Sequence, residues 1–287
     1  MFRVWFRVCF LVAVLILPRV AIAAPETLLF CNNPEKITVP GTYADTMLRA
    51  GQTYTVFFHY KNTLRSRGNL VVALSGDAGT PLTFTARKGF ANAHHDPTIA
   101  GRQAMARYLS APTKHYSGKN GGAHFALAVG SKRTASGVVT FTAQSDARMR
   151  IYFRHNKWTV PGARVVAVES PRRSVDILLA KGQAGERYRI GVPDPGMSKH
   201  LDGTYGMVYS FKVDAPVGSR VRVSFSPRGG QAGMVASVNG AIHQTDIVPA
   251  THWKVFCEAI VGQNGLTLTT APFGGVFYPV ELFFKII

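Results

Sequence analysis

Short apolar runs, rich in Val, Phe and Thr, recur along almost the whole chain, and most are bounded by Gly, Asn or Pro. These residue types favour extended backbone and the bounding residues favour turns, so each run predicts a β-strand. The predicted strands are residues 28–31, 53–60, 69–76, 81–86, 123–130, 138–143, 148–155, 164–170, 175–180, 188–192, 207–213, 220–225, 234–238, 266–270 and 280–286. Many short strands separated by turn residues are typical of β-sandwiches and β-barrels.

The predicted strands form two series along the sequence. The segment 157–164, with Pro-Gly at its centre, separates them, so we place a domain boundary near Val160. We therefore expect an all-β protein made of two tandem antiparallel β-sandwich domains, residues 24–160 and 161–287, with one short helix in an excursion from the first domain.

The excursion is predicted over residues 87–135, where the strand pattern breaks. Asp96 is a suitable N-cap and Pro97 suits the first helical position, so we expect a helix over residues 98–110. Its expected apolar arc consists of Ile99, Met105, Ala106 and Leu109, interrupted by Arg102. Excursions of this kind often carry binding residues, because a rigid scaffold holds them in place.

The first residues have the pattern of an export signal. Arg3 and Arg7 precede an apolar run, residues 9–17, and the small residues 21–23 form an A-x-A cleavage site. We therefore expect residues 1–23 to be a signal peptide and the protein to be secreted, either extracellular or periplasmic. The alternative is an uncleaved amphipathic anchor. No later run reaches about 18 apolar residues, so we expect no transmembrane span, while peripheral membrane contact is left open.

Signal cleavage would remove Cys9 and leave two cysteines, Cys31 and Cys257. Two cysteines in an exported chain most simply form one disulfide. Such a bond would hold the N-terminal strand, residues 28–31, against the second domain. The alternative is a pair of buried free thiols.

Adjacent histidines precede the predicted helix and raise the question of a metal site. Zinc needs three or four converging donors, whereas consecutive residues of an extended chain point to opposite sides. Because helix capping already accounts for Asp96, we expect no metal and no other cofactor. The candidate ligands, if a metal did bind, would be His94, His95, Asp96, His115 and His124.

Signatures of catalysis are missing from the sequence. It contains no G-x-S-x-G motif, the glycine-rich segment 117–122 lacks phosphate-loop spacing, and no specific nucleic-acid-binding motif occurs. Most acidic residues lie beside turn residues, where they favour turns. We therefore favour a protein that is not an enzyme. The competing hypothesis is a secreted carbohydrate-active or metal-dependent hydrolase that uses the histidine-bearing excursion.

Of all features of the sequence, its large excess of basic over acidic residues is the least ordinary. The chain carries 33 Lys and Arg residues against 15 Asp and Glu residues. Residues 24–160 hold 17 basic and 6 acidic residues, whereas residues 161–287 hold 13 and 9. Within residues 102–157 there are ten basic residues and a single acidic one, Asp146. Such a field attracts polyanions and speeds their capture.

A basic strand face is the predicted binding surface. In the strand 148–155, alternate residues face opposite sides, so the basic residues and a tyrosine share one face while Met149, Ile151 and Phe153 face the core. The predicted binding residues are Arg148, Arg150, Tyr152, Arg154 and Lys157, with Arg102 and Arg107 of the excursion. We therefore expect a secreted or cell-envelope binding or structural module whose partner is an anionic cell-surface polymer or acidic polysaccharide. The alternative is an ordinary solvated strand face.

Overall fold

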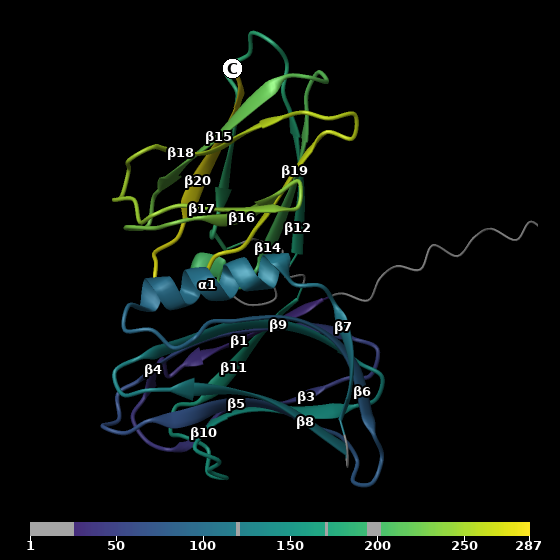
Figure 1. Cartoon of the computed structure of the whole chain (residues 1–287), viewed down its shortest axis with the longest axis vertical. Coiled ribbons are helices and arrows are strands. Elements are labelled where there is room, and N and C mark those ends of the chain that lie inside the picture. The colour runs from purple at the N-terminus through teal and green to yellow at the C-terminus, as the bar shows by residue number, and fades with distance from the viewer. Residues whose placement is uncertain (1–25, 119–120, 170–171, 194–201) are drawn as a thin grey trace, which may run out of the picture.

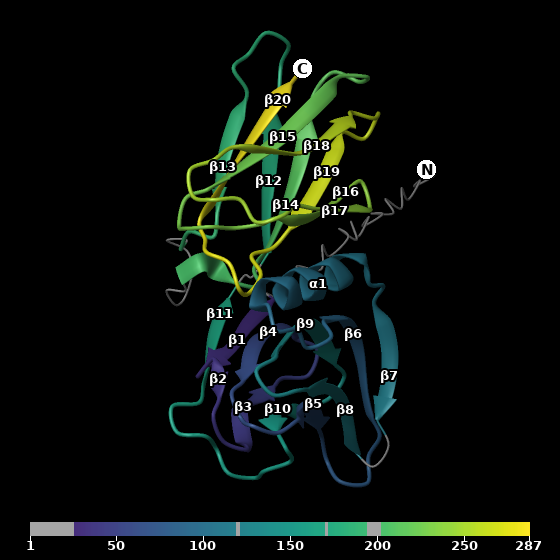
Figure 2. The same ribbon diagram turned by 60° about the vertical axis from the view of Figure 1, so that its left-hand side comes forward.

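The computed structural model describes residues 26–118, 121–169, 172–193 and 202–287. The chain forms two β-sandwich domains that are stacked end to end, with helix α1 between them (Figures 1 and 2). The predicted fold of two tandem β-sandwiches with one short helix is confirmed. The signal peptide predicted for residues 1–23 lies outside the described residues. No helix in the described part of the chain is long and apolar enough to cross a membrane.

The first domain pairs a large sheet with a smaller one. We name the large sheet, which faces the second domain, the inner sheet, and the smaller one the outer sheet. The inner sheet has the order β11 (Arg164–Glu169), β1 (Thr27–Asn33), β4 (Thr53–Asn62), β9 (Thr134–Ala143), β6 (Leu82–Phe90) and β7 (Lys114–Gly118), and β2 (Lys36–Ile37) also pairs with β4. The outer sheet has the order β3 (Gly41–Leu48), β10 (Ala147–Phe153), β5 (Gly68–Ser75) and β8 (Gly122–Val129). Most pairs are antiparallel, but β1 and β2 run parallel to β4.

The second domain is likewise a sandwich of two sheets. One sheet has the order β12 (Arg172–Leu178), β14 (Val208–Asp214), β19 (Leu266–Thr270), β16 (Val235–Val238) and β17 (Ala241–Gln244). The other has the order β13 (Glu186–Ile190), β20 (Val280–Ile286), β15 (Arg220–Pro227) and β18 (Lys254–Ile260). A single 3₁₀ turn, Asp202–Thr204, precedes β14.

The boundary between the domains lies later than the sequence pattern predicts. Strand β11 pairs with β1, with Glu169 opposite Thr27, so the first domain extends to Glu169. The predicted boundary near Val160 is wrong because this segment is a turn within the first domain. Val160 is buried in the first core, and its N–H donates to the carbonyl oxygen of Thr42 at 3.0 Å.

The inner sheet is buried on both of its faces. Along β4, Val56, Phe58 and Tyr60 face the core between the two sheets, whereas Phe57 belongs to the apolar cluster shared with the second domain. Successive side chains of a strand point to opposite faces, so a strand covered on both sides needs apolar residues at every position. This requirement explains why residues 53–60 show an almost continuous apolar run.

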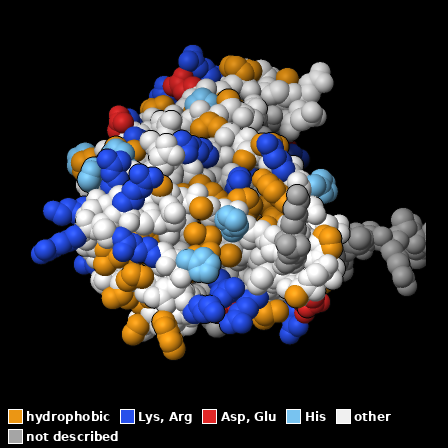
Figure 3. All heavy atoms as spheres, turned by 60° about the horizontal axis from the view of Figure 1, so that its bottom comes forward, with side chains coloured by type: hydrophobic (Ala, Val, Ile, Leu, Met, Phe, Trp, Pro, Cys, Tyr) orange, Lys and Arg blue, Asp and Glu red, His pale blue; other side chains and the backbone are white. Residues whose placement is uncertain are grey.

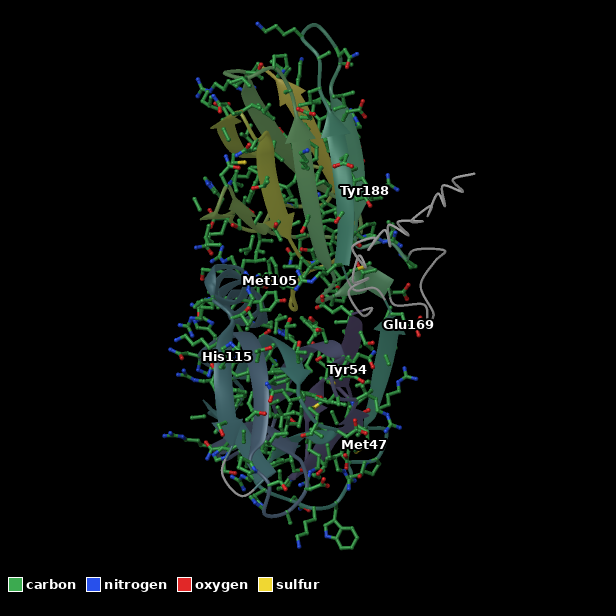
Figure 4. All side chains as sticks on the ribbon, turned by 90° about the vertical axis from the view of Figure 1, so that its right-hand side faces the viewer. Met47, Tyr54, Met105, His115, Glu169 and Tyr188 are labelled. Atoms are coloured by element: carbon green, nitrogen blue, oxygen red, sulfur yellow. The ribbon has the colours of Figure 1, made fainter. Side chains whose placement is uncertain are left out.

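Helix α1 (Pro97–Ser110) covers the free face of the inner sheet. It packs against β6 and β9 on one side and against β16 and β17 of the second domain on the other. Met105 lies where the two domains meet (Figure 4). The predicted excursion over residues 87–135 is too long, because the end of β6, all of β7 and β8 and the start of β9 lie within it and belong to the sandwich. The helix and the loops beside it lie outside the two sheets. The helix forms part of the contact between the domains.

Helix capping proceeds as the sequence predicts. The Oδ1 atom of Asp96 accepts a hydrogen bond from the N–H of Thr98 at 2.8 Å, and Pro97 occupies the first turn. The Nδ1 atom of His94 accepts from the N–H of Asp96 at 2.9 Å and so supports the same turn. The residues from His94 to Asp96 therefore form the start of helix α1.

Replacing Asp96 with alanine should lower the free energy of unfolding by about 1 kcal/mol, because an N–H of the first turn loses its acceptor. Urea denaturation followed by circular dichroism measures this difference. His95→Ala is the matched control, since His95 is exposed. An Asp96→Ala variant as stable as that control would contradict the capping role.

The two cysteines do not form the predicted disulfide. Both are free, and they lie in different cores: Cys31 is buried in the first domain and Cys257 in the second. Because strand residues alternate, Leu28 and Phe30 face the second domain while Cys31 points the other way. The N-terminal strand does lie against the second domain, but Phe30 makes that contact, with its ring centroid 6.4 Å from that of Tyr205. Burial raises the pKa of the Cys257 thiol to about 12 and that of Cys31 further still.

Candidate functional site

The outward face of the outer sheet carries the predicted binding strand. On β10, Met149, Ile151 and Phe153 are fully buried, whereas the alternate side chains of Arg148, Arg150 and Tyr152 point away from the core. The register of the sheet determines which residues of β3 and β5 lie beside these side chains. Arg150 lies opposite Asp45 of β3 and Ala73 of β5, and Tyr152 lies opposite Thr42 and Val71.

A hollow forms beside the large side chains of β10, because β5 and β8 present small ones. His124 and Ala126 of β8 lie opposite Ala73 and Val71 of β5. The resulting pocket has a volume of about 520 Å³ and is open to solvent. Its floor includes Val71 and Ala126, and its walls include His124, Tyr152, Arg154 and His155. Figure 3 views this end of the molecule, where Lys and Arg side chains are frequent, acidic ones are few, and His side chains lie beside hydrophobic ones.

A tight turn after β10 supplies one wall of this pocket. Arg154 and His155 both adopt positive φ angles, of 60° and 40°. This left-handed turn brings the imidazole of His155 back against the phenol ring of Tyr152, with 5.2 Å between ring centroids. The guanidinium of Arg154 donates to the carbonyl oxygen of Arg67 at 2.7 Å and also bonds to Ser66. Arg154 is thus held at the edge of the pocket while remaining exposed.

The arginines of β10 differ in how their charges are used. Arg148 forms a bidentate pair with Asp45, with both nitrogen–oxygen distances at 2.7 Å. This pair occupies both oxygens of the carboxylate that lies opposite Arg150. In the described part of the chain Arg150 has no ion pair within 4.0 Å, and its buried Nε atom has no hydrogen-bond partner. Arg150 is therefore a half-buried cation with free donors.

Lys157 lies near this face but outside the pocket. It is exposed on the loop that follows β10. This loop is tied to the outer sheet at β3, because the Thr42 hydroxyl donates to the Asn156 carbonyl oxygen at 3.0 Å.

Arg102 and Arg107 do not join the predicted surface, because they lie on α1 at the domain junction. The Arg102 guanidinium donates to the Thr245 carbonyl oxygen at 2.8 Å and lies 3.6 Å from Asp246 of the second domain. Arg107 donates to the Phe90 carbonyl oxygen at 2.7 Å. These arginines were assigned to binding from charge alone, whereas the structure uses them to attach the helix to its neighbours.

The structure does not bring the histidines together as metal ligands. Met47 lies opposite Arg148 and so marks the position of the basic strand. Figure 4 shows His115 on a different side of the first domain from Met47. His124 lines the pocket described above, and His94 and Asp96 are engaged at the helix start. No group of three or more His, Cys, Asp or Glu side chains among the described residues could hold a metal ion.

The second domain has a corresponding basic strand whose charge is neutralised. Arg220 and Arg222 of β15 both pair with Glu258 of β18, at 2.6 and 2.8 Å. The hydrogen bond from Arg222 and the nearby Arg220 charge lower the pKa of Glu258 below its ordinary value. The unpaired guanidinium of Arg150 therefore has no counterpart at Arg220 or Arg222.

Sequence reasoning missed the part of the pocket that β10 does not supply. Asn69, Val71, Ala126 and His155 carry no charge pattern or motif that would single them out. The one available signal is the alternation of small residues with larger ones in "AHFALAV", residues 123–129, which predicts a face of low side-chain volume.

Comparison with known proteins adds little to this geometry. No family model matches the sequence, and no curated protein matches it significantly. Among solved structures, the chain is similar to the N-terminal CBM22-1–CBM22-2 tandem domain of Xyn10C from Paenibacillus barcinonensis. The identity is 10%, the match covers 79% of this chain and 82% of that chain, and the TM-score is 0.20. A likeness this low carries no argument about function, so the assignment of two tandem β-sandwiches rests on the strand pairings.

Proposed function

We propose that the protein is a non-enzymatic binding module whose first domain holds an acidic polysaccharide on the outward face of the outer sheet. The observation that carries this proposal is Arg150. Its guanidinium is half-buried, its buried Nε atom has no partner, and the neighbouring Asp45 is already occupied by Arg148. A buried donor without a partner is costly, so an anionic ligand that reaches it gains a charge-assisted hydrogen bond.

The surroundings of Arg150 favour a carboxylated sugar polymer. Arg154 of the pocket supplies a second guanidinium, and Arg150 lies beside the pocket, because its partner Ala73 is itself opposite His124. Guanidinium groups form strong charge-assisted hydrogen bonds with carboxylates. Tyr152 offers an aromatic ring of the kind that packs against the apolar face of a sugar. The pocket is open to solvent on the outward face of the sheet, so it can accept one unit of an extended chain. A long-range positive field from the basic first domain would speed capture of such a chain.

The proposed location is the cell envelope or the space outside the cell. The charged, apolar and small-residue segments of residues 1–23 support this location. The competing hydrolase hypothesis is less well supported, because His94 and Asp96 of the histidine-bearing segment are engaged in starting α1.

The double variant Arg150→Gln, Arg154→Gln tests this proposal. We expect its affinity for polygalacturonate to fall at least about tenfold, because charge-assisted hydrogen bonds to two guanidinium groups are lost. Glutamine is chosen over glutamate so that no like charge is placed beside Asp45. Retention on polygalacturonate beads at increasing salt concentrations measures the effect, and salt should weaken binding of the wild type.

The matched control is Lys181→Gln, Lys212→Gln, which removes the same charge from exposed positions of the second domain. A control that loses as much affinity as the Arg150→Gln, Arg154→Gln variant would show that net charge alone drives binding. A double arginine variant that folds and binds like the wild type would contradict the assigned site.

A further inference from the structure

A second pocket, of about 400 Å³, lies between the two domains. The first domain contributes Asn32 and Glu35 near the end of β1, Phe57 and His59 of β4, and the start of α1. The second domain contributes Tyr205 and the loop 274–277. The pocket shares no residue with the one on the outer sheet. Its volume is within the range of small-molecule sites, about 300–1,000 Å³.

The walls of this interdomain pocket are held in place by specific contacts. The Thr98 hydroxyl donates to the Gly275 carbonyl oxygen at 2.9 Å, and the Tyr205 hydroxyl donates to the Val276 carbonyl oxygen at 2.8 Å. A Cβ atom added to Gly274 would lie 2.4 Å from Cγ of His59. Any larger residue at position 274 would therefore clash with the imidazole, and glycine lets the loop 274–277 lie this close to it.

His59 is the unusual residue of the pocket. It is 1% exposed, and neither ring nitrogen has a hydrogen-bond partner. Burial lowers the pKa of His59 to about 4, so its imidazole is neutral near pH 7 and offers one donor and one acceptor. Buried polar atoms are nearly always paired, so a ligand that offers both a donor and an acceptor would account for the two unpaired nitrogens at this pocket.

The remaining groups restrict the kind of ligand. Asn32 supplies an amide whose oxygen also accepts from the backbone N–H of His59 at 3.2 Å, and Glu35 is the charged side chain among the described lining residues. An anion would therefore meet a carboxylate and no cation. Phe57 and Tyr205 stack with ring centroids 6.0 Å apart, and Phe277, whose side chain is exposed, also lines the pocket. A purely apolar ligand would leave both nitrogens of His59 unpaired.

We propose that this interdomain pocket binds one ring of a neutral sugar. Hydroxyl groups both donate and accept, so they suit the neutral imidazole of His59 as well as Asn32 and Glu35. The apolar face of a sugar ring suits the rings of Tyr205 and Phe277. The site is separate from the proposed polyanion surface, and it joins ligand binding to the contact between the domains.

The test uses the full chain and isothermal titration with glucose, galactose, mannose and N-acetylglucosamine. We expect at least one of these sugars to bind. Phe277→Ala and Glu35→Gln, which change exposed side chains, should each weaken that binding by about tenfold or more. Leu178→Ala and Glu186→Gln change exposed side chains outside the pocket and should bind like the wild type.

The outcomes separate this proposal from the polyanion proposal. The Arg150→Gln, Arg154→Gln variant should bind the neutral sugar as tightly as the wild type. Binding of none of the four sugars, or equal binding by Phe277→Ala, Glu35→Gln and their controls, would overturn the proposal. Tight binding of choline that is lost in Glu35→Gln, without sugar binding, would assign the pocket to a cation and would also overturn it.

Discussion

Replacing Gly101 with alanine is expected to lower the free energy of unfolding by about 3 kcal/mol, which is the upper part of the usual range for overpacking. Gly101 lies inside α1 where the helix meets the second domain. A Cβ atom at this position would lie 1.9 Å from the carbonyl oxygen of Gly274 and 3.1 Å from the ring of Phe273. Because the nearest atom belongs to the backbone, the helix and the loop 274–277 would have to separate.

The sign of this effect makes the measurement decisive. In a helix that touches nothing, glycine to alanine stabilises by about 1 kcal/mol through helix propensity alone. Guanidinium denaturation of the full chain measures the change. Gln103→Ala, at a partly exposed position of the same helix, is the control. An unchanged or increased stability of Gly101→Ala would contradict the close approach of the two domains.

Acidification is expected to destabilise the folded chain through His59 by about 3 kcal/mol between pH 6.5 and pH 4. The folded state keeps this imidazole neutral down to a pKa of about 4, whereas the unfolded chain takes up the proton below about pH 6.5. The unfolded state thus binds more protons in this window, so stability present above pH 6.5 is lost as the pH falls. The cause is burial at the domain junction, where His59 has no hydrogen-bond partner.

The His59→Asn variant isolates this contribution. Carboxylates whose pKa is lowered by arginine partners, such as Glu258 and Glu281, also lose stability in acid, so the useful quantity is the difference between wild type and variant. Unfolding free energies of His59→Asn should depend less steeply on pH than those of the wild type. His95→Asn, at an exposed position, should retain the wild-type dependence. Identical pH profiles for all three proteins would refute the assignment to His59.

The strands that the sequence missed share one structural feature. Residues 41–48, 114–118, 241–244 and 254–260 form β3, β7, β17 and β18, and each of these is the edge strand of its sheet. An edge strand has a neighbour on one side only, and most positions of β7 and β17 are exposed or half-exposed. The apolar signature is therefore weak in these strands, whereas central strands such as β4 and some edge strands, such as β8, are evident in the sequence.

The proposed binding surface could be predicted only along a single strand. Alternation in residues 148–153 correctly separates the outward side chains from Met149 and Ile151, because the period of a strand is local. The partners of that face, Asp45 and His124 among them, come from strands far away in sequence and depend on sheet order and register. Local sequence does not encode these pairings.

The assignment of Arg102 and Arg107 failed for a related reason. Charge predicts an affinity for anions, but the orientation of α1 follows from its packing on both domains. The glycine at position 101, inside a predicted helix, was the available signal of a close contact, because glycine weakens a helix unless it is needed for packing.

The central claim is that the outward face of the first domain binds an acidic polysaccharide, and histidine ring NMR tests it most directly. His124 and His155 line the pocket, whereas His243 and His252 belong to the second domain. On titration with a short galacturonate oligomer, the ring signals of His124 and His155 should shift with a common saturation curve, and those of His243 and His252 should stay in place. Shifts confined to the second-domain histidines, or no shift in any histidine at saturating oligomer, would contradict the account.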